Sequence, residues 1–279
     1  MINEYIICSV NASTMTKTVQ IVGILNTTPD SYFDGGMFDH IDSAVKRAGE
    51  MIDEGVDIIE IGGQSTGPGS KDVTIPEEIE RTIPVIKAIK QAYPDASLSI
   101  DTFQSEVARQ AIEAGVMMVN DVTAGRSDSE MFNVVSAGNV QIVLMFSKDD
   151  SARTSVDEIY YDDVVKTVKE FLSARKSAAI EACIQEKNII LDPGLGHFVS
   201  SKPRFSFEII ERLSEFQELG CPLFISPSRK SFLAGKENLK TADRLPATIA
   251  ASALAAKNGA RYIRTHDVQD VRRGCEVVS

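Results

Sequence analysis

Three residues that accept hydrogen bonds stand directly after short apolar runs of this chain. Asp101 ends the run SLSID, Asn120 ends VMMVN and Asp192 ends NIILD. If these runs are parallel strands, their carboxyl ends meet at one edge, where such folds gather their binding residues. Carboxylate and amide oxygens suit the hydrogen-bond donors of a flat, nitrogen-rich ring. The spacing therefore predicts a pocket for a heterocycle.

Three basic side chains follow the last two apolar runs. Lys230 lies in SRKS, just after PLFIS, and Arg264 and His266 lie in ARYIRTH. An arginine offers a planar fork to phosphate oxygens, and a lysine offers a point charge. Barrels of parallel strands often hold phosphate beside their last two strands. We therefore expect a phosphate or pyrophosphate there, separate from the acceptor residues that meet the ring.

The elements that position these residues repeat along the chain. Short runs rich in Val, Ile and Leu predict strands at 20–25, 57–61, 97–100, 116–119, 141–145, 188–191, 222–226 and 260–264. Amphipathic stretches predict helices at 41–54, 76–92, 104–114 and 156–183, and a short last helix from about residue 267. Pro76 suits a first helical turn, and glycines at 55, 115, 220 and 259 suit helix ends.

Eight continuous apolar strands that alternate with helices predict the α/β class and a parallel sheet covered by helices. Eight units in about 250 residues match a (β/α)₈ TIM barrel. An open doubly wound sheet is the alternative, but the G-x-G-x-x-G loop after its first strand is absent, because LNTTPDS stands there. We expect one barrel domain at 19–279, preceded by an N-terminal extension at 1–18.

Composition narrows the class of partner. The chain has 279 residues, 43% hydrophobic and 25% charged, with a net charge of −11. A negative balance of this size argues against nucleic acid and anionic membranes as partners. The four cysteines are scattered without metal-type spacing, and we see neither a signal peptide nor an apolar run long enough to span a membrane. A cytoplasmic location is expected.

Over nearly its whole length the chain resembles the dihydropteroate synthase family of folate biosynthesis. The resemblance rests on GILNTTPDSYFDGG, DIIEIGGQSTGPGS, SIDTFQSEVARQAIEAG, VNDVTAG, LDPGLG, SRKSFLAG and YIRTHDV, which occur in the family's order. It implies a transferase that condenses 6-hydroxymethyl-7,8-dihydropterin pyrophosphate with 4-aminobenzoate to give 7,8-dihydropteroate and pyrophosphate. The family is thought to release pyrophosphate first, leaving a pterin cation.

The resemblance also implies roles for individual residues. Those expected to bind the pterin are Asp101, Asn120, Met145, Asp192 and Lys230, although Met145 suits the core equally well. Those expected to bind pyrophosphate are Asn26, Arg264 and His266, with Asn26 also a ligand of Mg²⁺, the implied cofactor. Those expected to contact aminobenzoate are Thr66, Pro68, Phe198 and Ser231. The implied catalytic residues are Asp30, which would face the cation, with Asn26, Lys230, Arg264 and His266. Arg229 is expected to brace its loop.

The chain departs from the family pattern around the aminobenzoate. The usual E-S-T-R-P-G reads Gln64 to Gly69 here, with Gly67 in place of arginine, and a lysine is missing after the sixth strand. DPGLGHFVSS, SIDTFQSE and YIRTH are similar to the divergent, sulfonamide-insensitive branch, which is tied to antibiotic resistance. We therefore expect added bulk near Phe198 to discriminate aminobenzoate from sulfonamides, and Lys202 is a candidate replacement for the missing lysine.

Other readings stay open. One is a methyltetrahydrofolate-binding domain of a corrinoid methyltransferase, which would not need the two glycine-rich loops or the cations for pyrophosphate. Another is a non-catalytic pterin-binding homologue, and a third is an enzyme with an altered nucleophile, such as a sugar-substituted aminobenzoate. The family pairs through its last helices, so a homodimer is expected.

Overall fold

The computed structural model describes residues 19–27, 37–64, 67, 69–70 and 72–278. Eight strands run through this part of the chain. They are β1 (Gln20–Asn26), β2 (Ile58–Gly62), β3 (Leu98–Asp101), β4 (Met118–Asp121), β5 (Gln141–Met145), β6 (Ile189–Asp192), β7 (Phe224–Ile225) and β8 (Tyr262–Thr265). Each overlaps a predicted strand, and the seventh is shorter than predicted.

Helices follow the strands in alternation. They are α1 (Met37–Asp53), α2 (Ile75–Ala92), α3 (Ser105–Glu113), α4 (Met131–Gly138), α5 (Val164–Glu181), α6 (Pro203–Glu211), α7 (Leu245–Lys257) and α8 (Val268–Glu276). Short 3₁₀ turns are η2 (Glu186–Asn188), η3 (Gly196–Phe198), η4 (Leu213–Leu219), η5 (Ser231–Ala234) and η6 (Thr241–Arg244). The predicted proline lies in the first turn of α2, and all four predicted helix-ending glycines have positive φ.

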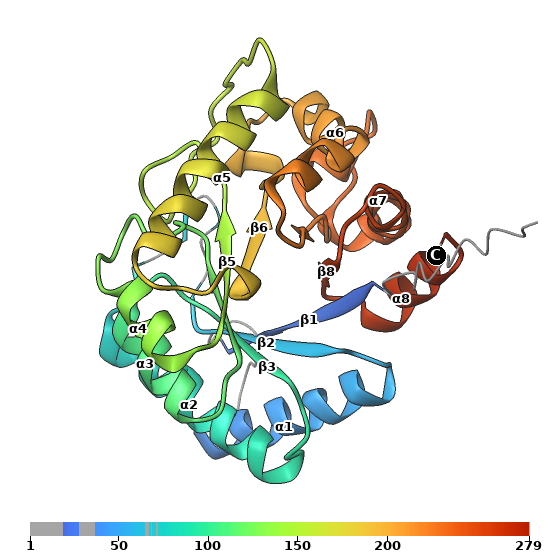
Figure 1. Ribbon diagram of the computed structural model, residues 1–279. Helices are drawn as coiled ribbons and strands as arrows, with labels where there is room; N and C mark the ends of the chain where they lie inside the picture. The colour runs from blue at the N-terminus through green and yellow to red at the C-terminus, as the bar shows by residue number, and fades with distance from the viewer. Residues whose placement is uncertain (1–18, 28–36, 65–66, 68, 71, 279) are drawn as a thin grey trace, which may run out of the picture.

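All the paired strands are parallel and form one sheet, in the order β6-β5-β4-β3-β2-β1-β8-β7. The helices surround this sheet on its outside, so the molecule is a TIM barrel, as predicted (Figure 1). The barrel is nearly closed. Between β6 and β7, a single parallel bridge joins Leu191 to Leu223, with the Leu191 amide donating to the Pro222 carbonyl at 3.0 Å.

The core has two layers because side chains alternate along each strand. One face packs outward beneath the helices and forms the large apolar core. The other face fills the inside of the barrel with a smaller cluster made of Val22, Ile58, Met118, Val143, Ile190, Phe224 and Tyr262. This inner layer closes the barrel interior beneath the candidate site.

One predicted helix begins later than expected. The stretch 156–163 is irregular, and α5 begins only at Val164, because Asp163 caps it by accepting a hydrogen bond from the Lys166 amide at 3.0 Å. The preceding residues are tied elsewhere, since the Tyr161 hydroxyl donates to the Val199 carbonyl at 2.7 Å. The prediction of a continuous helix over 156–183 was wrong for this part.

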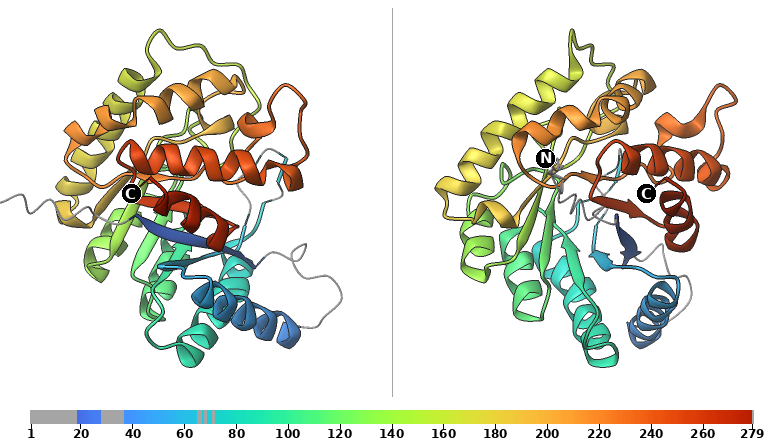
Figure 2. Two further views of the ribbon diagram at one scale, coloured as in Figure 1. Left: turned by 90° about the vertical axis from the view of Figure 1, so that its right-hand side faces the viewer. Right: turned by 45° about the vertical axis from the view of Figure 1, so that its right-hand side comes forward.

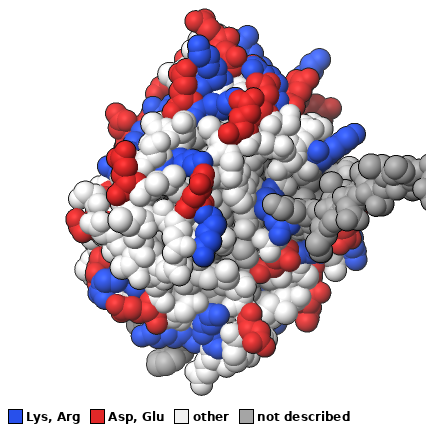
Figure 3. Space-filling view, viewed as in Figure 1, with Lys and Arg blue, Asp and Glu red and all other residues white. Residues whose placement is uncertain are grey.

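The exterior is mixed in charge. On the face seen in Figure 3, basic and acidic side chains are interspersed around large uncharged areas. Helices α7 and α8 lie side by side on the outside of the barrel (Figure 2). Within the described ranges, no helix combines the length and the apolar character that crossing a membrane would require.

Candidate active site

Polar side chains form the next layer above the apolar interior. Two residues beyond Ile58, Met118, Ile190 and Tyr262, the strands carry Glu60, Asn120, Asp192 and Arg264. A strand returns to the same face every second residue, so these side chains also point into the barrel. The carboxyl ends of β2, β4, β6 and β8 thereby bring together residues far apart in sequence.

A buried ion-pair cluster lies at the centre of this layer. The Arg264 guanidinium donates through Nε to Glu60 and through Nη2 to Asp101 Oδ2, the latter at 2.7 Å. Asn120 Nδ2 donates to Glu60 Oε1 at 3.2 Å. Glu60 was not among the predicted site residues. The available signal was one acidic residue inside the otherwise apolar strand DIIEI.

Burial governs the charges in this cluster. It raises the pKa of Glu60 and of Asp101, and the neighbouring Arg264 opposes the rise in both. Burial alone would lower the pKa of Arg264, but the carboxylates of Glu60 and Asp101 raise it. The arginine therefore stays charged, and it neutralises carboxylates that would be costly to bury without a partner.

This arrangement corrects one expectation. The sequence predicted that the acceptor residues and the cations occupy separate parts of the site, but Asp101 and Arg264 are an ion pair. The two regions are continuous at this point, because β3 and β8 both point side chains into the same barrel mouth.

Asp192, which is buried, and Lys230, which is partly buried, are two further charged residues of the site. Burial raises the pKa of Asp192 to about 6, against the effects of Lys230 and of the Gly194 amide, which donates to Asp192 Oδ1 at 2.7 Å. Burial lowers the pKa of Lys230 to about 8, against the effect of Asp192. Lys230 Nζ donates to the Leu195 carbonyl at 3.2 Å and lies 5.2 Å from the centre of the Phe198 ring.

The turn after β6 has a backbone that only glycine accommodates. Gly194 has φ +70°, and a Cβ placed there would lie 2.5 Å from the Phe146 carbonyl oxygen. The close approach lets the Gly194 amide fold back onto Asp192. The sequence DPG after the strand thus fixes the direction of the Asp192 carboxylate.

The segment after β7 is braced as predicted. Arg229 contacts Asp267 with two hydrogen bonds, from Nε to Oδ2 at 2.9 Å and from Nη2 to Oδ1 at 2.6 Å. Ser228 Oγ lies 2.9 Å from His266 Nδ1. Burial, and next the charge of Arg264, lower the pKa of His266 to about 4, so the ring is neutral at pH 7.

A cavity of about 830 Å³ opens beside this segment. Its lining comes from the segments that follow five strands, β2, β5, β6, β7 and β8: Gly67, Thr154, Gly196, His197, Phe198, Ser228, Arg229, Lys230, Ser231, Thr241 and His266. Of the predicted site residues, Phe198, Lys230, Ser231 and His266 thus share one cavity. Ser231 Oγ lies 3.0 Å from His197 Nε2.

The other predicted residues have different surroundings. Asn26 is exposed at the end of β1, and its Oδ1 is 3.6 Å from where a Cβ on Gly62 would lie. Met145 is buried in a small cluster that includes Phe198. Lys202 pairs with Glu158 at 2.9 Å and is not among the residues that line the cavity. Asp30, Thr66 and Pro68 lie outside the described residues.

Known proteins resemble nearly the whole chain. The pterin binding enzyme family matches residues 22–266. A dihydropteroate synthase of Clostridium beijerinckii is 39% identical over 258 residues, which cover 92% of this chain and 92% of that protein. The crystal structure of a dihydropteroate synthase of Clostridium difficile with pteroic acid has a TM-score of 0.86 and 36% identity, over 94% and 96% of the two chains. The structure of a dihydropteroate synthase of Xanthomonas albilineans with 4-aminobenzoic acid has a TM-score of 0.86 and is 35% identical. The match covers 94% of this chain and 92% of that chain.

Proposed function

The chain belongs to the dihydropteroate synthase family of pterin-binding enzymes, and on this basis we propose which of its described residues bind each of the two substrates. The reaction joins 6-hydroxymethyl-7,8-dihydropterin pyrophosphate to 4-aminobenzoate and releases pyrophosphate. In this proposal the layer of polar side chains above the apolar interior binds the pterin, and the adjoining cavity binds aminobenzoate. The observation that carries it is that Lys230 lines the cavity and also donates to the Leu195 carbonyl, in the turn that follows Asp192.

The proposed pterin site uses Asp101, Asn120, Asp192 and Lys230, with Met145 beneath the ring. Asp192 is held by the Gly194 amide, and its second oxygen would accept from the ring N–H groups. Asp101 would accept from the same ring and exchange its bond to Arg264 for it. The released N–H group of Arg264 would then point to the pyrophosphate, so that binding the ring prepares the cation for the leaving group.

The proposed pyrophosphate site uses Asn26, Arg264 and His266. Arg264 supplies a fixed positive charge where negative charge grows as the C–O bond breaks. His266 is neutral, because its pKa is lowered to about 4 by burial and by Arg264, and with Nδ1 beside Ser228 its Nε2 is left to meet a phosphate oxygen. The pterin cation that remains would be attacked by the aminobenzoate nitrogen, whose proton leaves afterwards. Asp30 is retained in the proposal as the residue facing the cation.

Magnesium fits this site as an ion that arrives with the substrate. Among the described residues, no group of three or more His, Cys, Asp or Glu side chains could hold a metal ion. Mg²⁺ commonly binds phosphates with only one or two protein oxygens, and the exposed Asn26 amide offers one. When bound, Mg²⁺ would neutralise charge on the pyrophosphate.

The proposed aminobenzoate pocket uses Phe198 and Ser231, with Thr66 and Pro68 expected from the opposite loop. His197 and Phe198 stand side by side in its wall. Their bulk supports the proposal that sulfonamides bind less well than aminobenzoate, which is smaller beyond the ring.

The test is pyrophosphate release from the pterin pyrophosphate with Mg²⁺, with and without 4-aminobenzoate, and again with sulfamethoxazole. Release that requires aminobenzoate supports the assignment of substrates. Release that survives the drug supports the proposal for Phe198, and ordinary inhibition contradicts it. Tight pterin binding without release would favour a non-catalytic homologue or another nucleophile.

We also propose a homodimer. A hollow of about 750 Å³ between α6, η5 and α7 is lined mainly by apolar side chains. Phe207 and Leu254, both beside it, are 47% and 46% exposed. A second copy would cover this surface, and Leu254→Glu should then reduce the mass measured by light scattering by half, with unchanged mass contradicting the proposal. A cytoplasmic location is likewise proposed, and the reduced cysteines Cys183 and Cys221 support it.

A further inference from the structure

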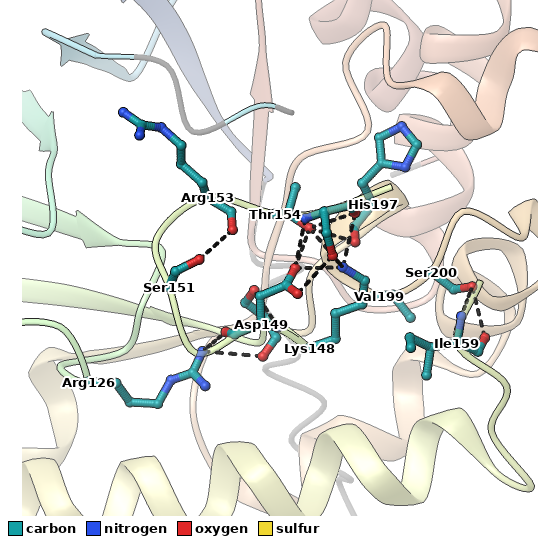
Figure 4. A network of polar contacts seen from close by, with 12 residues as sticks. Arg126, Lys148, Asp149, Ser151, Arg153, Thr154, Ile159, His197, Val199 and Ser200 are labelled. Atoms are coloured by element: carbon teal, nitrogen blue, oxygen red, sulfur yellow. Dashed lines mark hydrogen bonds and ion pairs between the residues drawn. The ribbon is translucent and has the colours of Figure 1, made fainter. Parts of the chain in front are cut away.

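The loop between β5 and α5, residues 146–163, contains a compact polar network (Figure 4). The Lys148 side chain is only 5% exposed and donates to Asp149 Oδ2 at 2.6 Å, to Ser155 Oγ at 2.8 Å and to the Ser155 carbonyl at 3.0 Å. Asp149 Oδ2 also accepts from the Ser155 amide at 3.0 Å. These contacts close residues 148–155 into a tight turn.

Asp149 stays ionised near neutral pH. Burial alone would raise the pKa of Asp149, but hydrogen bonds from Lys148, the Ser155 amide and Thr154 lower it to about 2. Arg126 fixes the turn from outside the loop, donating to the Asp149 carbonyl at 2.9 Å and to the Ser147 carbonyl at 3.2 Å. The turn is therefore a firm base for the two residues at its tip, Arg153 and Thr154.

Thr154 contacts one wall of the cavity. Its hydroxyl lies 2.8 Å from the His197 carbonyl oxygen, and the His197 ring is 3.0 Å from Ser231 Oγ. Thr154, His197 and Ser231 all line the cavity. The Lys148 amide adds a bond to the Phe198 carbonyl at 2.8 Å. This wall carries the residues proposed to contact aminobenzoate.

Arg153 contacts the segment that carries Gly67, another residue of the cavity lining. Figure 4 shows its guanidinium extending away from the side of the loop that faces His197. Its Nε donates to Ser70 Oγ at 3.1 Å, and its Nη1 forms an ion pair with Asp72. Ser70 Oγ donates in turn to the Gly67 carbonyl at 2.8 Å, and Gly67 lines the cavity.

We propose that Arg153 is a positioning residue for aminobenzoate, holding the Gly67 wall of the cavity at a fixed separation from the wall of His197 and Ser231. Arg153 and Thr154 are neighbours in the chain, so one peptide unit links the contacts to both walls. The separation decides how well a flat aryl amine fits between them. The inference rests on the proposed function, in which this cavity binds aminobenzoate.

The effect should appear in one kinetic constant. Arg153→Ala and Ser70→Ala should each raise the KM for aminobenzoate about tenfold, since misplacement by about 1 Å can cost on the order of a hundredfold. The KM for the pterin pyrophosphate should stay within about twofold, because Arg153 contacts Ser70 and Asp72, which are not part of the proposed pterin site. Arg153→Lys should recover part of the loss, since lysine can still pair with Asp72.

Arg109→Ala is the matched control. Arg109 also forms surface ion pairs, with Glu106 and Glu113 on α3, but it lies outside the cavity lining. It should leave both KM values unchanged. The temperature of unfolding, measured for every variant, distinguishes loss of positioning from loss of the fold.

The outcomes separate the two proposals. A wild-type protein that makes no product from aminobenzoate would overturn the proposed function and this inference with it. An active wild type whose KM for aminobenzoate is unchanged in Arg153→Ala and Ser70→Ala overturns the inference alone. Equal losses for both substrates, together with a lower unfolding temperature, would show a merely structural role and also overturn it. If Arg153→Ala does not fold, Ser70→Ala and Arg153→Lys decide.

Discussion

At the scale of single residues, the Glu60–Arg264 pair has the clearest energetic consequence. Glu60 is 0% exposed, and Arg264 is largely buried against it. Removing one member of a buried pair leaves the other uncompensated, at a cost of about 3–5 kcal/mol. Glu60→Ala should therefore lower the free energy of unfolding by about 3 kcal/mol, the low end of that range, because Asp101 remains beside Arg264.

Urea denaturation measures this change. Glu60→Gln is the control for shape, since its amide oxygen can still accept a hydrogen bond from Arg264, and it should lose less stability than Glu60→Ala. Equal losses in the two variants would show that volume, and not the partner of the arginine, matters at this position.

A second residue-scale prediction concerns Asp192 and pH. Burial raises its pKa to about 6, so the carboxylate is protonated as pH falls below 6 and stops accepting from ring N–H groups. Calorimetry with 6-hydroxymethylpterin should show the Kd rising about tenfold per pH unit below pH 6. Lys230, whose pKa is lowered to about 8, keeps its proton throughout that range.

Asp192→Asn supplies the control for that titration, because the amide does not change protonation, and its weaker binding should vary less between pH 5 and 7. The contribution of Asp192 to the free energy of unfolding changes with pH in the opposite direction to its contribution to pterin binding. A carboxyl whose folded pKa is raised contributes most below its unfolded pKa, near 3.8, and loses that contribution as pH rises through about 6. A binding curve as steep in the variant as in the wild type would assign the titration to another group.

At the scale of elements, the turn after β6 depends on its glycine. Gly194→Ala would place a Cβ 2.5 Å from the Phe146 carbonyl in a left-handed conformation, φ +70°. Left-handed backbone alone costs about 1–2 kcal/mol, and the contact with backbone adds to it. We expect the free energy of unfolding, measured by urea denaturation, to fall by at least about 2 kcal/mol. Pterin binding should also weaken, because the amide that orients Asp192 moves. Gly69→Ala provides a comparison, since nothing lies within 4 Å of its added Cβ.

Elements with regular periodicity were predictable, and irregular ones were not. Most strands have an apolar run with a polar end, which is why the sequence placed Asp101, Asn120 and Asp192 at the carboxyl ends of strands. The role of the 146–163 loop was not found, because its contacts depend on Lys148, Arg153 and Thr154 reaching segments distant in the chain. Glu60 was missed for a different reason, since its strand was read as apolar throughout.

At the scale of the whole molecule, the barrel has one weak seam. Neighbouring strands elsewhere pair over two to five residues, whereas β6 and β7 share the single bridge from Leu191 to Leu223. Opening this seam breaks fewer bonds than opening another, so it should open with a smaller free energy. Hydrogen exchange should be faster at the Leu191 amide than at the Ile100 amide in β3. Equal protection would mean that the helices outside, and not the strand pairing, hold the seam.

The Arg264 ion pairs also bear on how the chain is made. Its partners Glu60 and Asp101 precede it by 204 and 163 residues, so a ribosome releases both carboxylates long before their cation. A nascent barrel that closed early would bury two negative charges without compensation, at a high cost. The last strand brings the arginine and pairs with β1 in the same step. During synthesis, the barrel closes and its buried carboxylates gain their cation in the same step. Closure of an incomplete chain is therefore energetically unfavourable.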